Sequence, residues 1–218
     1  MKLLYLFSYL NQYTLPNFAD FLNHATTDSD YQIVVLMQIE EQKRVIMDFM
    51  KQTDIALAWE RVHFISPTIN EEQAPAITSE KLKLATGILV WGGNMHLYQK
   101  FYASPEITAI INEKYHAHVP YAGVSAGSIL ALNFELITDI AIKPHFTEKN
   151  RFFELVKKMR KNKVSIGYGI DDNLSLKIMD NKEIKCVGKD SFYLIERTEE
   201  QEYKINVFKN EDQLAISN

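Results

Sequence analysis

The chain has 218 residues, of which 46% are hydrophobic and 24% charged, a globular composition that excludes a disordered chain. Its net charge of -4, without a basic stripe, argues against nucleic acid as a partner. A single cysteine, Cys186, excludes a disulfide framework and indicates a reducing, cytoplasmic compartment.

The first two thirds of the chain alternate strand-like and helix-like segments, which is typical of a parallel sheet covered by helices. Leu3–Phe7 is apolar but short, and Ser8 interrupts the run, so we interpret it as a buried strand rather than a signal peptide. No apolar run approaches the roughly 20 residues that span a bilayer. Next we expect a helix opened by Pro16, a strand at 32–37, a helix at 40–59, a strand at 61–65, and a loop or broken helix at 71–78.

The second half of the chain continues this alternation and then changes to hairpins. The expected elements are a strand at 87–91, helices at 95–102 and 105–116, a strand at 119–124, a helix beginning at Ser125, an amphipathic helix at 152–160, and β-hairpins after Val164. Asp180–Lys182 is the turn between alternating runs at 174–178 and 183–187. We therefore expect one domain over residues 1–218, a three-layer, doubly wound, mostly parallel α/β fold with C-terminal β-hairpins.

The segment Gly123-Val124-Ser125-Ala126-Gly127 lies between the predicted strand at 119–124 and a helix. This is the context of a nucleophile elbow, a strained strand-to-helix turn that holds a serine hydroxyl clear of the backbone. The Ala126 N–H, at the start of the helix, can then point at a developing oxyanion. The alternative is a glycine-containing turn with an incidental serine, which the preceding strand disfavours.

A second glycine-rich segment, Gly92-Gly93-Asn94, follows the predicted strand at 87–91. Parallel sheets place their sites at the carboxyl ends of the strands, so this segment and the elbow can face one crevice. A Gly93 N–H can supply the second oxyanion donor. Taken alone, the segment favours a plain tight turn.

A serine nucleophile needs a base and a carboxylate that orients the base. Of the six histidines, His145 lies in a loop after the elbow helix, where Pro144 stiffens the chain. Asp139, Asp171 and Asp172 are the candidate acids, and composition does not choose among them. The chain has no His-x-x-x-His motif or cysteine cluster, so we predict neither a metal nor a cofactor.

Four motifs in this order resemble the S51 serine peptidases, the family that contains dipeptidase E (aspartyl dipeptidase) and cyanophycinase. They are Ile88–Asn94 with its Gly-Gly-Asn end, Gly123–Gly127, His145-Phe146 with Arg151 downstream, and Gly167–Asp172. The resemblance implies a fold similar to that of class I glutamine amidotransferases, with serine in place of their cysteine.

The resemblance also implies roles. Ser125 would be the nucleophile and His145 the general base. The acid would be Asp172 by analogy with cyanophycinase-like members, or Asp139 by analogy with dipeptidase E-like members; we favour Asp172, which lies in a glycine-bordered loop. The other implied residues are Gly93 and Ala126 in the oxyanion hole, and Gly92, Asn94, Lys149 and Arg151 at the substrate.

The chain also departs from the family pattern. Trp91 replaces a common glycine, Ser128 an alanine, and Asp172 a glutamate. The arginine that reads aspartate in dipeptidase E is not clearly matched, with Lys149 and Arg151 the nearest cations, so strict Asp-X specificity does not follow from the resemblance.

We therefore predict a serine hydrolase that cleaves a small peptide or amide through an acyl-enzyme, with Cys186 structural. The rival hypotheses are an inactive S51-like protein that binds a small molecule or a partner, motivated by Trp91 and Asp172, and an amidotransferase-like module. The expected partner is a small peptide or amide, with neither nucleic acid nor membrane, and a homodimer is left open.

Overall fold

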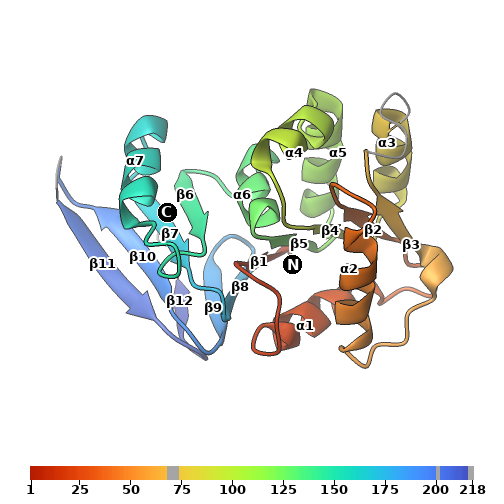
Figure 1. The fold of residues 1–218 in the computed structure, drawn as a ribbon, viewed down its shortest axis with the longest axis horizontal. Coiled ribbons are helices and arrows are strands. Elements are labelled where there is room, and N and C mark those ends of the chain that lie inside the picture. The colour runs from red at the N-terminus through yellow and green to blue at the C-terminus, as the bar shows by residue number, and fades with distance from the viewer. Residues whose placement is uncertain (68–73, 200–201, 216–218) are drawn as a thin grey trace.

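The computed structural model describes residues 1–67, 74–199 and 202–215, which form two sheets with helices packed around them (Figure 1). The larger, eight-stranded sheet has the order β12-β9-β8-β1-β5-β4-β2-β3. Its five parallel strands are β1 (Leu3–Phe7), β5 (Tyr121–Val124), β4 (Gly87–Val90), β2 (Ile33–Leu36) and β3 (Val62–Ile65). Beside β1 the sheet continues in antiparallel fashion with β8 (Leu174–Met179), β9 (Glu183–Gly188) and β12 (Gln213–Ala215).

Helices cover both faces of this sheet, and the side chains of β1 show the division. Leu3, Tyr5 and Phe7 pack toward α1 (Leu15–Ala25) and α2 (Gln42–Lys51), whereas Leu4 and Leu6 face the other layer. That layer contains α3 (Ala74–Leu84), α4 (Met95–Tyr102), α5 (Pro105–His116) and α6 (Ala126–Asn133). The expected three-layer, doubly wound fold is therefore confirmed. None of the described helices is long and apolar enough to cross a membrane.

The second sheet was not expected in this form. It has the order β11-β10-β7-β6, with β6 (Ile140–Pro144) parallel to β7 (Ile166–Ile170), and β10 (Phe192–Arg197) and β11 (Tyr203–Phe208) forming a hairpin. The helix α7 (Phe152–Asn162) connects β6 to β7 and packs on one face, while the other face joins the main core. The segment around Pro144, expected to be a loop, ends strand β6. This proline is tolerated because β6 is an edge strand.

Two helix boundaries differ from the sequence prediction. The helix expected at 40–59 ends at Lys51, because the Thr53 hydroxyl donates to the Met50 carbonyl (2.6 Å) and Asp54 takes a positive φ of 57°. In the segment expected to be loop or broken helix, α3 begins at Ala74, since a proline at position 75 is compatible with a first helical turn. Residues 71–73 of that prediction lie outside the described residues.

Candidate active site

The backbone at Ser125 is strained in the way a nucleophile elbow requires. Ser125 links β5 to α6 with φ 51° and ψ -105°, a conformation that a non-glycine residue rarely adopts. A Cβ on Gly123 would strike the Gly127 carbonyl, and a Cβ on Gly127 would strike the carbonyl of Val90. Glycine is therefore needed on both sides of the serine so that β5 and α6 can approach this closely.

A buried serine anchors the elbow to the neighbouring strands. The Ser128 hydroxyl lies 2.8 Å from the Phe7 carbonyl and 2.6 Å from the Gly123 carbonyl, and the Ser125 N–H donates to Phe7 as well (2.8 Å). These bonds connect the first turn of α6 with the ends of β1 and β5. Ser128, where the family that the chain resembles commonly has alanine, thus has a structural role beneath the elbow.

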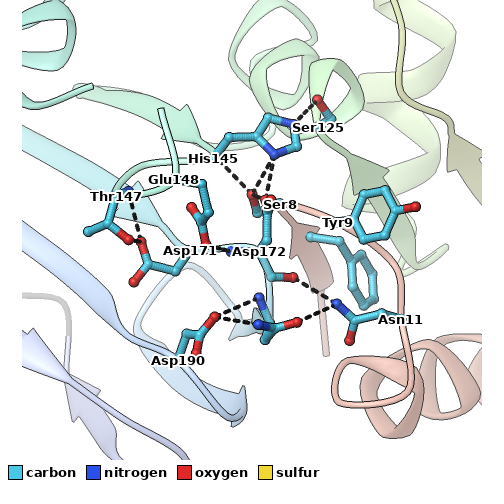
Figure 2. Close-up of polar contacts among 12 residues, drawn as sticks. Ser8, Tyr9, Asn11, Ser125, His145, Thr147, Glu148, Asp171, Asp172 and Asp190 are labelled. Atoms are coloured by element: carbon cyan, nitrogen blue, oxygen red, sulfur yellow. Dashed lines mark hydrogen bonds and ion pairs between the residues drawn. The ribbon is translucent and has the colours of Figure 1, made fainter. Parts of the chain in front are cut away.

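Ser125, His145 and Asp172 form a continuous hydrogen-bonded chain (Figure 2). Ser125 Oγ lies 2.9 Å from His145 Nε2, and His145 Nδ1 contacts Asp172 Oδ1. His145 follows β6 and Asp172 follows the adjacent parallel strand β7, where Pro144 pairs with Ile170. Because β6 and β7 are parallel, their carboxyl ends lie side by side, as do the carboxyl ends of β1, β5 and β4 in the larger sheet. The two sheets meet where these two sets of strand ends come together.

The other two candidate acids, Asp139 and Asp171, make hydrogen bonds with other groups. Asp139 precedes β6 whereas His145 follows it, so the two residues lie at opposite ends of a strand, roughly 20 Å apart at the usual rise. The Asp139 carboxylate accepts instead from the Thr138 hydroxyl (2.8 Å). Asp171 accepts from the N–H (3.0 Å) and hydroxyl (2.8 Å) of Thr147, which secures the turn after His145.

Ser8, which the sequence analysis did not single out, joins the same network (Figure 2). Its hydroxyl donates to Asp172 Oδ1 (2.6 Å) and accepts from the His145 backbone N–H (2.6 Å), and the residue is completely buried. A polar residue directly after a buried strand, at the edge where the elbow also lies, was the signal that could have identified it. Ser8 thus connects Asp172 with the backbone of His145.

A further set of polar groups holds the backbone of Asp172. Its carbonyl accepts from the Asn11 amide (3.2 Å) and its N–H donates to the Glu148 carboxylate (2.8 Å). Burial raises the pKa of Glu148, and the negative charges of Asp171 and Asp172 raise it further, against the lowering effect of the donated N–H. Asn173, which bonds to Asn11 and Asp190, extends this network away from the site.

The Gly92-Gly93-Asn94 segment is held against the elbow by two glutamines. Gln38 bonds both backbone groups of Asn94, accepting from its N–H at 2.8 Å, and Gln42 donates to the Gly92 carbonyl (3.0 Å). A Cβ on Gly93 would strike the Gln38 amide, so a side chain there has no room. A Cβ on Gly92 would lie 3.3 Å from Cβ of Ser125, which shows how closely the two segments approach.

A cavity of about 330 Å³ opens beside Ser125 and His145. Its lining residues are Tyr9, Leu10, Gln42, Val45, Phe49, Trp91, Gly92, Gly93, Val124, Ser125 and His145. Of the four residues expected at the substrate, only Gly92 is among them. Asn94 instead accepts from the His96 N–H (2.8 Å) as the N-cap of α4, and Lys149 and Arg151 lie in the turn before α7.

Within the described residues, no group of three or more histidine, cysteine, aspartate or glutamate side chains is placed to hold a metal ion.

Comparison with known proteins agrees with the resemblance seen in the sequence. The model of peptidase family S51 matches residues 46–137, a range that contains the Gly92–Asn94 segment and the elbow but ends before His145. A crystal structure of a peptidase from an acI-B1 Actinobacterium matches with a TM-score of 0.74 and 16% identity, covering 99% of this chain and 97% of that one. A putative peptidase E protein from Listeria monocytogenes EGD-e matches with a TM-score of 0.58 and 16% identity, covering 85% and 98% respectively. No curated protein matches the chain.

Proposed function

We propose that this chain, which resembles peptidase family S51 in sequence and shares its fold with peptidase E-like structures, is a serine hydrolase of small peptides or amides. The family match supports the broad assignment as a peptidase. The observation that carries the finer assignment is the 2.9 Å contact between Ser125 Oγ and His145 Nε2, with Asp172 on the other imidazole nitrogen.

In the first step, Ser125 Oγ attacks the carbonyl carbon of the scissile bond while its proton passes to His145 Nε2. Asp172 accepts from His145 Nδ1–H, which keeps Nε2 free of a proton in the resting enzyme and stabilises the imidazolium that forms. The negative charge then lies on the former carbonyl oxygen. His145 returns the proton to the leaving amine, and the acyl group remains on Ser125.

The oxyanion in this proposal is stabilised by backbone N–H groups. Ala126 is the first residue of α6, so its N–H lies in the turn that has no intrahelical acceptor and near the positive end of the helix dipole. Gly93 supplies the second N–H from the segment that Gln38 and Gln42 hold against Ser125. Such preorganised donors are worth about 10²- to 10³-fold each in rate. Water, activated by His145, then releases the acyl group in the reverse sequence of proton transfers.

The test is a screen of dipeptides and isoaspartyl dipeptides with the wild type and two serine variants. Ser125→Ala should lose nearly all hydrolysis while keeping its fold, as judged by circular dichroism and thermal melting. Ser165→Ala, at an exposed serine before β7, is the matched control and should hydrolyse like the wild type. Equal turnover by Ser125→Ala would refute the assignment. A folded wild type that hydrolyses none of the library would favour the rival hypothesis of a non-catalytic binding protein.

A further inference from the structure

The wall of the cavity beside Ser125 is apolar, and helix α2 supplies a large part of it. Gln42, Val45 and Phe49 occur at positions i, i+3 and i+7, so they lie on one face of the helix, and all three line the cavity. The charged residues of α2, among them Lys43, Arg44 and Asp48, do not line it and border a separate groove. The sequence of α2 therefore presents its uncharged face to the candidate active site.

Residues after the strands complete this apolar wall. Trp91, directly after β4, packs against Phe49 with ring centroids 6.1 Å apart, and Leu10 and Val124 are buried beside Ser125. Tyr9 and Val45 keep 53% and 49% of their surface exposed, yet both border the same cavity. Large apolar side chains exposed together in a concave site indicate a ligand that covers them.

The residues that line this cavity disfavour the acidic side chain that an aspartyl dipeptidase binds. No lysine, arginine, aspartate or glutamate is among the described residues that line it. Lys149 and Arg151, the cations expected at the substrate, lie outside it, as do Lys43 and Arg44, which border a separate groove. A carboxylate entering such a cavity would lose hydration without gaining a cationic partner. An apolar side chain would instead gain by leaving water.

The order of the strands shows which part of a substrate meets this wall. Along the carboxyl edge of the sheet, β1 is followed by Ser8, β5 by Ser125, and β4 by the segment that contains Gly92, with β2 and α2 beyond. Ser8 contacts the backbone of His145. His145, which must protonate the leaving amine, approaches from the β1 side. Tyr9 and Leu10, which follow β1, border the cavity on that side, whereas Trp91, Val45 and Phe49 lie on the β4 and β2 side. In Figure 1, α2 and β6 accordingly lie on opposite sides of β5.

We infer that this cavity binds an apolar or aromatic side chain on the residue that contributes the scissile carbonyl, so that the substrates are peptides of the type Phe-X or Leu-X. The inference rests on the proposed hydrolase function, because only a hydrolase has a scissile carbonyl. The binding preference itself does not require turnover. It assigns specificity to Phe49 and Trp91, with Val45 at the rim.

The test measures binding separately from chemistry. Dipeptides X-Ala, free and N-acetylated, with X as Phe, Leu, Ala, Asp or Lys, are titrated by calorimetry into the Ser125→Ala protein. Phe-Ala should bind at least about 10-fold more tightly than Asp-Ala and Ala-Ala, since an apolar side chain of this size gains about 1.5–3 kcal/mol on burial. Tighter or equal binding of Asp-Ala, or no binding of Phe-Ala in either form, would overturn the inference.

Two aromatic substitutions in the Ser125→Ala background localise the effect. Phe49→Ala should reduce the ratio of Phe-Ala to Ala-Ala affinity by about 10-fold, because it removes the ring that packs against Trp91 in the wall. Phe153→Ala removes a phenylalanine that is 78% exposed on α7, outside the cavity, and should leave the ratio unchanged. An unchanged ratio in folded Phe49→Ala protein would place the apolar side chain elsewhere and contradict the inference.

Hydrolysis by the wild type separates the two proposals. Rapid cleavage of Asp-Ala with slow cleavage of Phe-Ala would leave the hydrolase standing and overturn the apolar specificity. Selective binding of Phe-Ala without any cleavage would support the specificity of the cavity and count against the hydrolase.

Discussion

The Ser8 hydroxyl donates a 2.6 Å hydrogen bond to the carboxylate of Asp172, although 164 positions separate the two residues. Ser8 directly follows the first strand of one sheet, and Asp172 follows a strand of the other. Because the same hydroxyl also accepts the backbone N–H of His145, it links Asp172 and His145 to each other. Ser8 is thus a positioning residue of the proposed triad.

We expect Ser8→Ala to lower kcat about 10- to 100-fold with little change in KM, since a hydrogen bond to a charged group is worth about 1.5–3 kcal/mol. The pH profile of kcat should change as well, because Asp172 loses a donor that stabilises its charge. Ser175→Ala, which removes another completely buried serine hydroxyl, is the control for stability and should retain kcat. Loss of stability in Ser8→Ala with normal kcat and an unaltered pH profile would assign Ser8 a merely structural role.

The glycines around Ser125 differ in what they tolerate. Gly127→Ala should destabilise the fold by about 1–3 kcal/mol or more, because its Cβ would strike the Val90 carbonyl. Gly92→Ala should fold nearly normally but lower the rate of hydrolysis, because its Cβ would lie 3.3 Å from Cβ of Ser125, beside the reacting hydroxyl. Urea denaturation and kcat/KM, measured on both variants, check this difference. A Gly127→Ala protein as stable as the wild type would show that the elbow is less tightly packed than described.

Cys186 should be chemically inert in the folded protein. It is completely buried in β9, and burial raises the pKa of its thiol from 9.0 to about 12. The stability that the buried neutral thiol contributes is therefore complete below about pH 9 and is lost as the pH rises toward 12. A maleimide should label native protein very slowly and urea-unfolded protein rapidly, and Cys186→Ala should keep hydrolysis. Fast labelling of native protein with loss of activity would reopen a cysteine mechanism.

Lys158 on α7 opposes folding near neutral pH. Burial, with the positive charge of Lys143 as a smaller cause, lowers its pKa from 10.5 to about 8. The cost of its charge is full below about pH 8 and disappears as the pH rises toward 10.5, where the unfolded chain also loses the proton. Lys158→Met should therefore stabilise the protein by roughly 1–3 kcal/mol at neutral pH, and less above pH 10.

Lys157→Met, at the exposed neighbouring position, is the control and should change stability little at either pH. Denaturation curves at three pH values are sufficient for the comparison. A gain from Lys158→Met that does not shrink as the pH rises would show that it comes from packing rather than from removal of the charge.

The sequence predicted the doubly wound sheet well because its strands are continuous apolar runs and its helices show clear periodicity, as at Pro105–His116. It did not predict β6, because Pro144 indicates a loop and the parallel partner of each β6 residue lies 26 positions further along the chain. The boundary of α2 depended on Asp54 taking a positive φ, which no periodic pattern reveals.

For the candidate site, local motifs identified the elbow and the glycine segment, because their backbone geometry demands glycine. The motifs could not place Lys149 and Arg151, whose positions depend on the turn secured by Asp171. They also could not reveal Ser8, because its role arises only where β1 of one sheet meets the ends of β6 and β7 of the other.

The most direct test of the account is the rate at which a fluorophosphonate modifies Ser125, since it reports the reactivity of the serine without requiring the natural substrate. Peptide mapping should find the label on Ser125 and not in Ser125→Ala. Asp172→Asn should lower the second-order rate constant by about 10²- to 10⁴-fold, the effect of a histidine held in the wrong tautomer. Asp139→Asn should react at the wild-type rate. Labelling of another residue, or unchanged labelling of Asp172→Asn together with slow labelling of Asp139→Asn, would contradict the proposed Ser125–His145–Asp172 triad.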